Sequence, residues 1–155
     1  MKTRALNAAI ALSLASVTLS GCATIAGEDG RFTRADFEAA VVENRYNVYF
    51  NHGSAEIVSS GEALIDANAE RAGNENFGYI ITGHTDTSDE ASDNLVLSRQ
   101  RAEAVAGYLA AEHQVPRDRM LVSGLGETRL ANPTPDGVKD PINRRVEVVI
   151  VKLGL

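Results

Sequence analysis

The sequence predicts an α/β sandwich (α+β) in which helices pack on one mixed sheet in the order βαβαββ. Short segments rich in branched and aromatic residues alternate with longer segments of helical periodicity, and Gly and Pro stand between them. The last segment, residues 144–153, is an almost continuous apolar run, which is typical of a strand covered by helices. We therefore expect one domain of this class at residues 45–153.

Each element of this order has its own local signal. The expected strands contain β-branched or aromatic residues, and the expected helices end at glycine, asparagine or proline. The expected strands are residues 46–50, 79–83, 120–124 and 144–153, and the expected helices are residues 61–72 and 94–113.

The first 21 residues have the pattern of an export signal. Lys2 and Arg4 precede an apolar run at residues 8–19, which is too short to span a bilayer comfortably. The run ends in "LSGC", which resembles the lipobox of bacterial lipoproteins and implies that Cys22 is lipidated, with acyl chains such as palmitate. The alternative is a free thiol at Cys22 after an ordinary cleaved signal. Ala23 resembles the residue that follows the cysteine in lipoproteins sorted to the outer membrane.

Residues 22–44 are expected to form a lipidated tether. This segment contains one short amphipathic stretch whose apolar members are Phe37, Val41 and Val42. Cys22 is the only cysteine of the chain, so an intramolecular disulfide is excluded.

The charge of the chain excludes two classes of partner. Lys2 and Arg4 are the only charged residues of the signal, so its removal changes the formal net charge from −6 to −8. An acidic chain of this kind is not expected to bind nucleic acid, and it would be held at an anionic bilayer by acyl chains rather than by its surface charge.

One residue contradicts the amphipathic pattern of the second helix. On a helical wheel, Arg101 lies in the middle of the apolar arc, with Asn94 and Ser98 on the same face. A guanidinium buried without an acceptor costs several kcal/mol, so a carboxylate partner is expected, and Asp86 is the first acidic residue of the preceding loop. The pair could be a structural ion pair. It could also form a pocket for a zwitterion, in which the carboxylate receives an ammonium group and the arginine receives a carboxylate.

Several spaced motifs then point to a family. The segment "GHTD…NLVLSRQRA", the "SAEI" after the first strand, the "GLGE" turn and the final "NRRVEVVIV" together resemble the OmpA-like C-terminal domain family of OmpA, MotB and Pal-type proteins. The resemblance covers residues 45–153, and it implies a non-enzymatic domain without a cofactor. It also implies non-covalent binding of the diaminopimelate in the peptidoglycan stem peptide, and so a tether between the outer membrane and the cell wall.

The resemblance also implies site residues. Asp86 corresponds to the aspartate that receives the ligand's ammonium, and Arg101, fifteen positions later, to the arginine that receives its carboxylate. Asn94 and Leu97 correspond to the asparagine and leucine between them, with Asn94 expected to form hydrogen bonds or shape the loop. Arg144 corresponds to the arginine of the family's last strand.

The chain departs from the family pattern at three places. Asn51-His52-Gly53 replaces an acidic and aromatic segment, Ser88 and Asp89 stand where the family has a glycine, and the loop before Asn143 has a different length. We therefore expect this side of the pocket to contact a ligand less than in the family, or differently.

Two other functions were weighed. A metal site or an acid/base pair at His84 and Asp86 is disfavoured, because His52 and His113 lack clustered carboxylate or thiol partners in the sequence. A Pal-like protein-interaction module of the Tol system is the alternative function, although "TSD" stands where Pal relatives have an "ERG"-like triplet. The expected location is the cell outer membrane, lipid-anchored, with the domain in the periplasm of the cell envelope.

Overall fold

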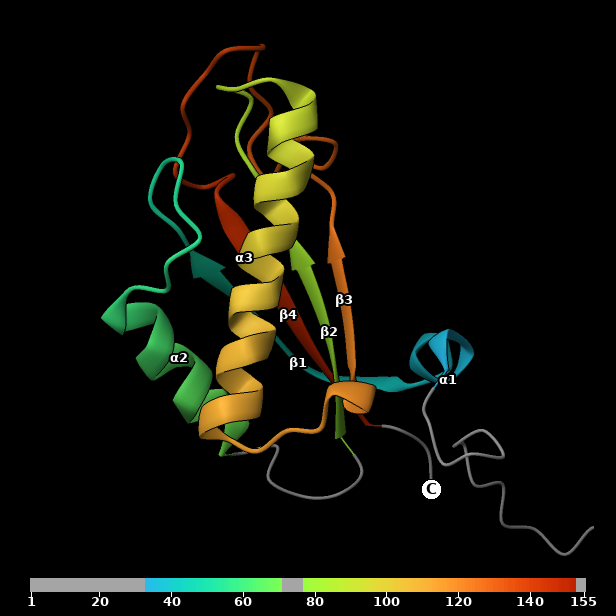
Figure 1. The fold of residues 1–155 in the computed structure, drawn as a ribbon. Helices are drawn as coiled ribbons and strands as arrows, with labels where there is room; N and C mark the ends of the chain where they lie inside the picture. Colours follow the sequence, from blue (N-terminus) through green and yellow to red (C-terminus); the bar gives the residue numbers. More distant parts are fainter. Residues whose placement is uncertain (1–32, 71–76, 153–155) are drawn as a thin grey trace, which may run out of the picture.

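The computed structural model describes residues 33–70 and 77–152, which contain a four-stranded mixed sheet and its helices (Figure 1). The strands are β1 (Val41–Tyr49), β2 (Phe77–Gly83), β3 (Met120–Gly124) and β4 (Arg145–Lys152). The helices are α1 (Arg34–Glu38), α2 (Ser59–Ala69) and α3 (Ala91–Glu112), with a short 3₁₀ turn, η1 (Arg117–Arg119), before β3. The predicted class and the predicted βαβαββ order are confirmed, with α1 added before them.

The strand order places the C-terminal ends of β1, β2 and β3 at the same edge of the sheet. The sheet runs β1-β4-β2-β3, with β4 antiparallel to both β1 and β2, and β3 parallel to β2. Strands β1, β2 and β3 therefore all point to one edge, where β4 begins. The segments that follow or precede these ends, residues 50–58, 84–90 and 125–144, gather there (Figure 1). Any site built from them lies at this edge of the sheet.

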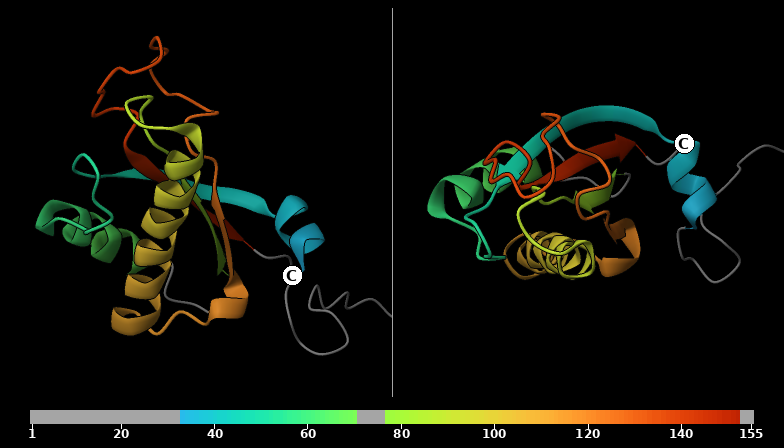
Figure 2. Two further views of the ribbon diagram at one scale, coloured as in Figure 1. Left: turned by 45° about the horizontal axis from the view of Figure 1, so that its top comes forward. Right: turned by 90° about the horizontal axis from the view of Figure 1, so that it is seen from above.

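The core lies between the sheet and two helices. Figure 2 shows α2 and α3 on the same side of the sheet. The main core consists of side chains from β1, β2, β4, α2 and α3, among them Val48, Ile65, Ile81, Val105, Leu109, Val146 and Val148. On the other face, Phe37 of α1 packs with Val149 and Val151 of β4 in a second, smaller core. Because β4 buries side chains on both faces, its continuous apolar sequence is explained.

The first strand begins earlier than expected. Val41 and Val42, predicted to share an amphipathic stretch with Phe37, instead belong to β1 and pair with Lys152 and Val151. Their side chains remain 65% and 53% exposed, so the tertiary pairing rather than local burial makes this segment a strand. The division between tether and domain expected after residue 44 thus falls inside β1. The other elements lie within three residues of their expected bounds.

Two predictions lie outside the described residues. The export signal at residues 1–21 and the lipidated Cys22 precede residue 33, where the described part begins. Among residues 33–70 and 77–152, none of the helices has both the length and the apolar character needed to cross a membrane.

Candidate ligand-binding site

The N-terminal half of α3 carries a buried polar face. Asn94, Ser98 and Arg101 are 1%, 0% and 0% exposed. Further along, the same face becomes apolar, with Ala102, Val105, Ala106 and Leu109 in the main core. The predicted burial of Arg101 is therefore confirmed.

The predicted partner of Arg101 is wrong. Its Nε donates to the carbonyl oxygen of Ser54 at 2.8 Å, and its Nη1 and Nη2 donate to the carbonyl oxygens of His84 and Asn51, each at 3.0 Å. Its guanidinium carbon also lies 5.5 Å from the centre of the Phe50 ring, within the range of a cation–π contact. Neutral carbonyl oxygens thus replace the water around the guanidinium, so no carboxylate has to be buried beside it. Arg101 joins the turn after β1 to the end of β2.

Arg101 remains charged at neutral pH. Burial lowers the pKa of its guanidinium to about 10, and the charge of Arg144 adds to this, whereas Asp86 and Asp89 raise the pKa. The positive charge of Arg101 therefore lies beneath the loops at this edge of the sheet and acts on the carboxylates of Asp86 and Asp89.

Asp86 pairs instead with Arg144. Its Oδ2 lies 2.9 Å from Nη1 of Arg144 and accepts the backbone N–H of Asp140 at 3.0 Å, while its Oδ1 accepts the Ser88 hydroxyl at 2.7 Å. Burial raises the pKa of the Asp86 carboxyl, but the hydrogen bonds from Ser88, Arg144 and Asp140, with the charge of Arg144, outweigh it, so the pKa lies below its ordinary value. Asp86 is an anion held at 2% exposure.

The other two predicted site residues also lie on α3. Asn94 donates from Nδ2 to the carbonyl oxygen of Asp89 at 3.0 Å and to Oε2 of Glu127 at 2.6 Å. It therefore joins the loop before α3 to the loop after β3. Leu97 is half-buried and lies about one turn before Arg101.

Two glycines allow α3 to approach the sheet closely. A Cβ built on Gly83 would lie 1.8 Å from the carbonyl oxygen of Ser98, and one on Gly124 would lie 2.5 Å from the backbone nitrogen of Arg99. The Ser98 hydroxyl, between these points, accepts the N–H of Gly126 at 2.8 Å. These two glycines therefore set the distance between α3 and the strand ends.

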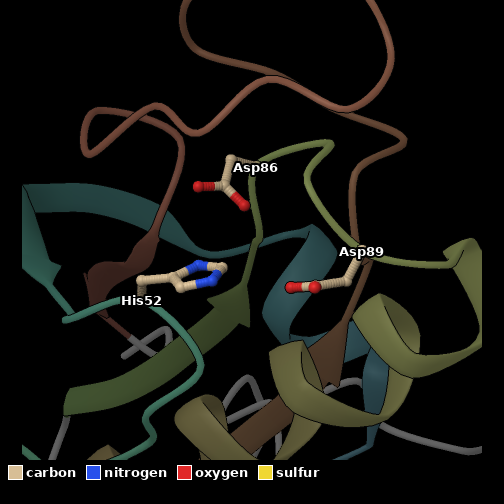
Figure 3. A group of neighbouring side chains, drawn as sticks. All are labelled: His52, Asp86 and Asp89. Carbon is tan, nitrogen blue, oxygen red and sulfur yellow. The ribbon is translucent and has the colours of Figure 1, made fainter.

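Three side chains from separate segments converge at the surface of this edge (Figure 3). They are His52 of the turn after β1, Asp86 after β2 and Asp89 of the loop before α3, and one ligand atom from each lies within 4.8 Å of the others. His52 and Asp89 are exposed and Asp86 is buried. The expectation that His52 lacks carboxylate neighbours is thus wrong, because the fold brings together residues that are distant in the sequence.

Two hollows lie beside Asp86. The first, of about 370 Å³, is mostly apolar, and its lining includes Tyr49, Val58, Ile142 and Arg144. The second, of about 610 Å³, is polar and acidic, and its lining includes Thr87, Ser88, Asp89, Glu90, Asp93, Glu127 and Asp136. Asp86 hydrogen bonds to a lining residue of each, Arg144 and Ser88.

Sequence reasoning missed the residues that hold this site together. The N–H of Asp140 and the hydroxyl of Ser88 hold Asp86, and buried Asn143 accepts the N–H groups of Ala131 and Asn132. Backbone donors and loop asparagines give no periodic signal. Of these residues, only Ser88 could have been predicted, because it belongs to the run of carboxylates and hydroxyls that follows β2.

The fold and this edge together define a class of protein: a small α/β domain with a charged candidate binding site built from strand-end loops. A family model described as the OmpA family matches residues 49–144. The chain belongs to the OmpA family.

Curated relatives share part of this chain. It is 42% identical over 72 residues to the peptidoglycan-binding protein ArfA of Mycobacterium tuberculosis, a match that covers 45% of this chain and 21% of ArfA. It is 26% identical over 106 residues to outer membrane protein A of Escherichia fergusonii, covering 66% of this chain and 42% of that protein. The chain therefore spans less than half the length of either relative.

A solved structure shares both fold and sequence. The peptidoglycan-associated lipoprotein of Burkholderia pseudomallei superposes with a TM-score of 0.60 at 27% identity, covering 67% of this chain and 88% of that one. The C-terminal domain of Helicobacter pylori MotB, at 21% identity and a TM-score of 0.59, shares the fold.

Proposed function

We propose that this protein is an outer-membrane lipoprotein whose periplasmic domain binds the diaminopimelate of peptidoglycan non-covalently and tethers the outer membrane to the cell wall. The observation that carries the proposal is the Asp86–Arg144 ion pair at the loop edge, with Arg101 beneath it. One carboxylate and two guanidiniums at one edge of the sheet complement the charges of a zwitterion. Membership of the OmpA family, the name of ArfA and the likeness to a peptidoglycan-associated lipoprotein support it.

The proposed roles follow the charges. Asp86 receives the ammonium group at the side-chain end of diaminopimelate. The guanidinium charges of Arg144 and Arg101 attract its carboxylate, and Arg144, whose side chain is 14% exposed, is the one at the pocket surface. Arg101 is fully buried and uses three of its five N–H groups on carbonyls of the described residues, so it acts on the ligand's carboxylate through its charge. Asn94 and Leu97 shape the wall on α3.

The first test is sedimentation with purified peptidoglycan. Asp86→Asn removes the charge at nearly constant volume, and we expect at least a tenfold loss of the pelleted fraction at limiting peptidoglycan, because a charge-assisted contact contributes about 1.5–3 kcal/mol. Asp118→Asn, an exposed carboxylate change in η1, is the matched control. Equal pelleting of folded Asp86→Asn and wild type would contradict the proposal.

The lipid anchor has a separate test. If Cys22 carries acyl chains, the mature protein fractionates with outer membranes and its mass exceeds that of the unmodified chain from residue 22. Cys22→Ser should release it into the periplasmic fraction, since no other anchor is proposed. Mass spectrometry of an unlipidated, cleaved wild-type chain would refute the anchor and leave the binding site untouched.

A Pal-like protein-interaction module of the Tol system is the second candidate function. The likeness to the Burkholderia lipoprotein favours it. The two candidates separate in the sedimentation experiment. A wild-type domain that stays in solution with peptidoglycan, but is cross-linked in the periplasm to an envelope protein, would favour the second.

A further inference from the structure

His52 and Asp89 depart from the family pattern, yet they converge on Asp86, the residue proposed to receive the ligand's ammonium (Figure 3). We propose that His52, Asp86 and Asp89 form a three-acceptor site for a primary ammonium group, which makes His52 and Asp89 specificity-determining residues of this chain. The inference rests on the proposed function and identifies which groups select the ligand's cationic end.

The geometry fits an ammonium group. The three ligand atoms lie within 4.8 Å of one another, and 4.8 Å divided by √3 places a central atom at most about 2.8 Å from each. That distance is typical of a charge-assisted N–H···O hydrogen bond of about 2.7–2.9 Å. A primary ammonium has three N–H donors, one for each acceptor.

Each of the three side chains has acceptor capacity to spare. Asp86 uses three of its roughly four acceptor positions, on Arg144, Asp140 and Ser88. Asp89 receives only a 3.3 Å contact from the Ser88 hydroxyl. Within residues 33–70 and 77–152 neither His52 nor Asp89 is in a salt bridge.

The charge around the cluster also favours a cation in the centre. Asp86 and Asp89 repel each other, and a single hydroxyl, that of Ser88, contacts both carboxylates. Arg144 pairs with Asp86, and the charge of Arg101 beneath them acts on both Asp86 and Asp89. An ammonium between the two carboxylates removes their repulsion, whereas a divalent metal would meet the guanidinium of Arg144 2.9 Å from Asp86.

Buried polar residues hold the three acceptors in place. Arg101 donates to the carbonyl oxygens of Asn51 and Ser54, which lie on either side of His52 in the chain. Asn94 donates to the carbonyl oxygen of Asp89. With the acceptors fixed before the ligand arrives, less conformational entropy is lost on binding.

The test uses the full chain in detergent micelles, with soluble muropeptides containing meso-diaminopimelate as the probe. Binding is measured by calorimetry for wild type, His52→Ala and Asp89→Asn, with Asp118→Asn, an exposed carboxylate in η1, as the matched control. A second probe is the same muropeptide with its free amine acetylated, which removes the ammonium and keeps the carboxylate.

We expect His52→Ala and Asp89→Asn each to weaken binding of the free-amine muropeptide about tenfold, and Asp118→Asn to change it less than twofold. Acetylation should weaken wild-type binding and abolish the difference between wild type and the two variants. If both variants bind like wild type while Asp86→Asn does not, the three-acceptor site is wrong and the proposed function stands. If wild type binds neither probe, both are overturned.

Discussion

Arg101 contributes to the stability of the domain mainly through the three carbonyl oxygens that accept its hydrogen bonds. Its three donors meet three carbonyl oxygens on two segments that are far apart in the sequence, and it is fully buried. Removing it leaves those carbonyls without partners and opens a cavity. A mutation designed to remove a binding residue would therefore also loosen the edge of the sheet.

Arg101→Ala should lower the free energy of unfolding by about 3 kcal/mol or more, since each unsatisfied buried acceptor costs roughly 1–3 kcal/mol. Arg101→Lys should fall between alanine and wild type, because an ammonium keeps the charge but cannot reach three divergent carbonyls. Urea denaturation measures both. Arg99→Ala, on the exposed side of α3, is the control and should stay within about 0.5 kcal/mol of wild type. An Arg101→Ala protein as stable as this control would refute the role of the carbonyl contacts.

His84 gives the domain a pH dependence. Its side chain is 0% exposed, and neither ring nitrogen has a hydrogen bond of ordinary geometry among the described residues, although a backbone contact with Arg129 partly raises its pKa. Burial, with the charges of Arg145 and Arg129, lowers the pKa of His84 from 6.5 to about 4. Between pH 6.5 and pH 4 the unfolded chain binds a proton at His84 that the folded chain does not bind. The free energy of unfolding therefore falls as the pH falls through this range, and the loss ends below about pH 4.

The loss from His84 should amount to about 3 kcal/mol between pH 7 and pH 4. His84→Gln should remove this part of the slope when unfolding free energies are measured by urea at several pH values. A His84→Gln protein with an unchanged slope would show that another group carries the dependence.

At the scale of elements, the distance between α3 and the ends of β2 and β3 determines the site. The backbone of Ser98 and Arg99 lies against Gly83 and Gly124 with no room for a Cβ. This contact allows the guanidinium of Arg101 to reach the carbonyl oxygen of His84. Close packing of one helix against two strand ends is thus a requirement for the binding edge.

Two glycine substitutions test this contact against an internal control. Gly83→Ala should destabilise the domain by more than about 3 kcal/mol, because its Cβ would meet a backbone oxygen at 1.8 Å. Gly107→Ala, in α3, should stabilise the domain by about 0.5–1 kcal/mol, because a Cβ there has nothing within 4 Å. Thermal unfolding distinguishes the expected loss of stability in Gly83→Ala from the expected gain in Gly107→Ala. A Gly83→Ala protein with wild-type stability would mean that α3 can move away from β2 at little cost.

Local sequence signals predicted the elements whose own periodicity is strong. Strand β3 has the expected bounds, and α3 has the expected buried arginine. The start of β1 could not be predicted, because Val41 and Val42 become strand only through pairing with β4. Helix α1 keeps only five residues of its expected amphipathic stretch.

For the whole molecule, the sheet order explains why the site could be predicted only in part. The sequence predicts Asp86 as the partner of Arg101, because Asp86 is the first acidic residue of the loop that precedes the helix. Local sequence patterns give no sign that β4 begins beside β1 and β2, and only the family resemblance implied that Arg144 belongs to the site. This strand order brings Arg144 to Asp86 and leaves Arg101 to the carbonyls. Similarly, His52 meets Asp89 only because β1 and β2 end at the same edge.

The most direct measurement of the central claim is an NMR titration of the isotope-labelled protein with a soluble diaminopimelate muropeptide. The account predicts amide shifts confined to the turn at Asn51–Ser54, the loop at His84–Asp89 and the segment around Asp140, all lost in Asp86→Asn. It also predicts binding at least tenfold weaker for the lysine-containing muropeptide, which lacks the side-chain carboxylate. Shifts at another surface, or equal affinity for the two muropeptides, would contradict recognition of a zwitterion at this edge.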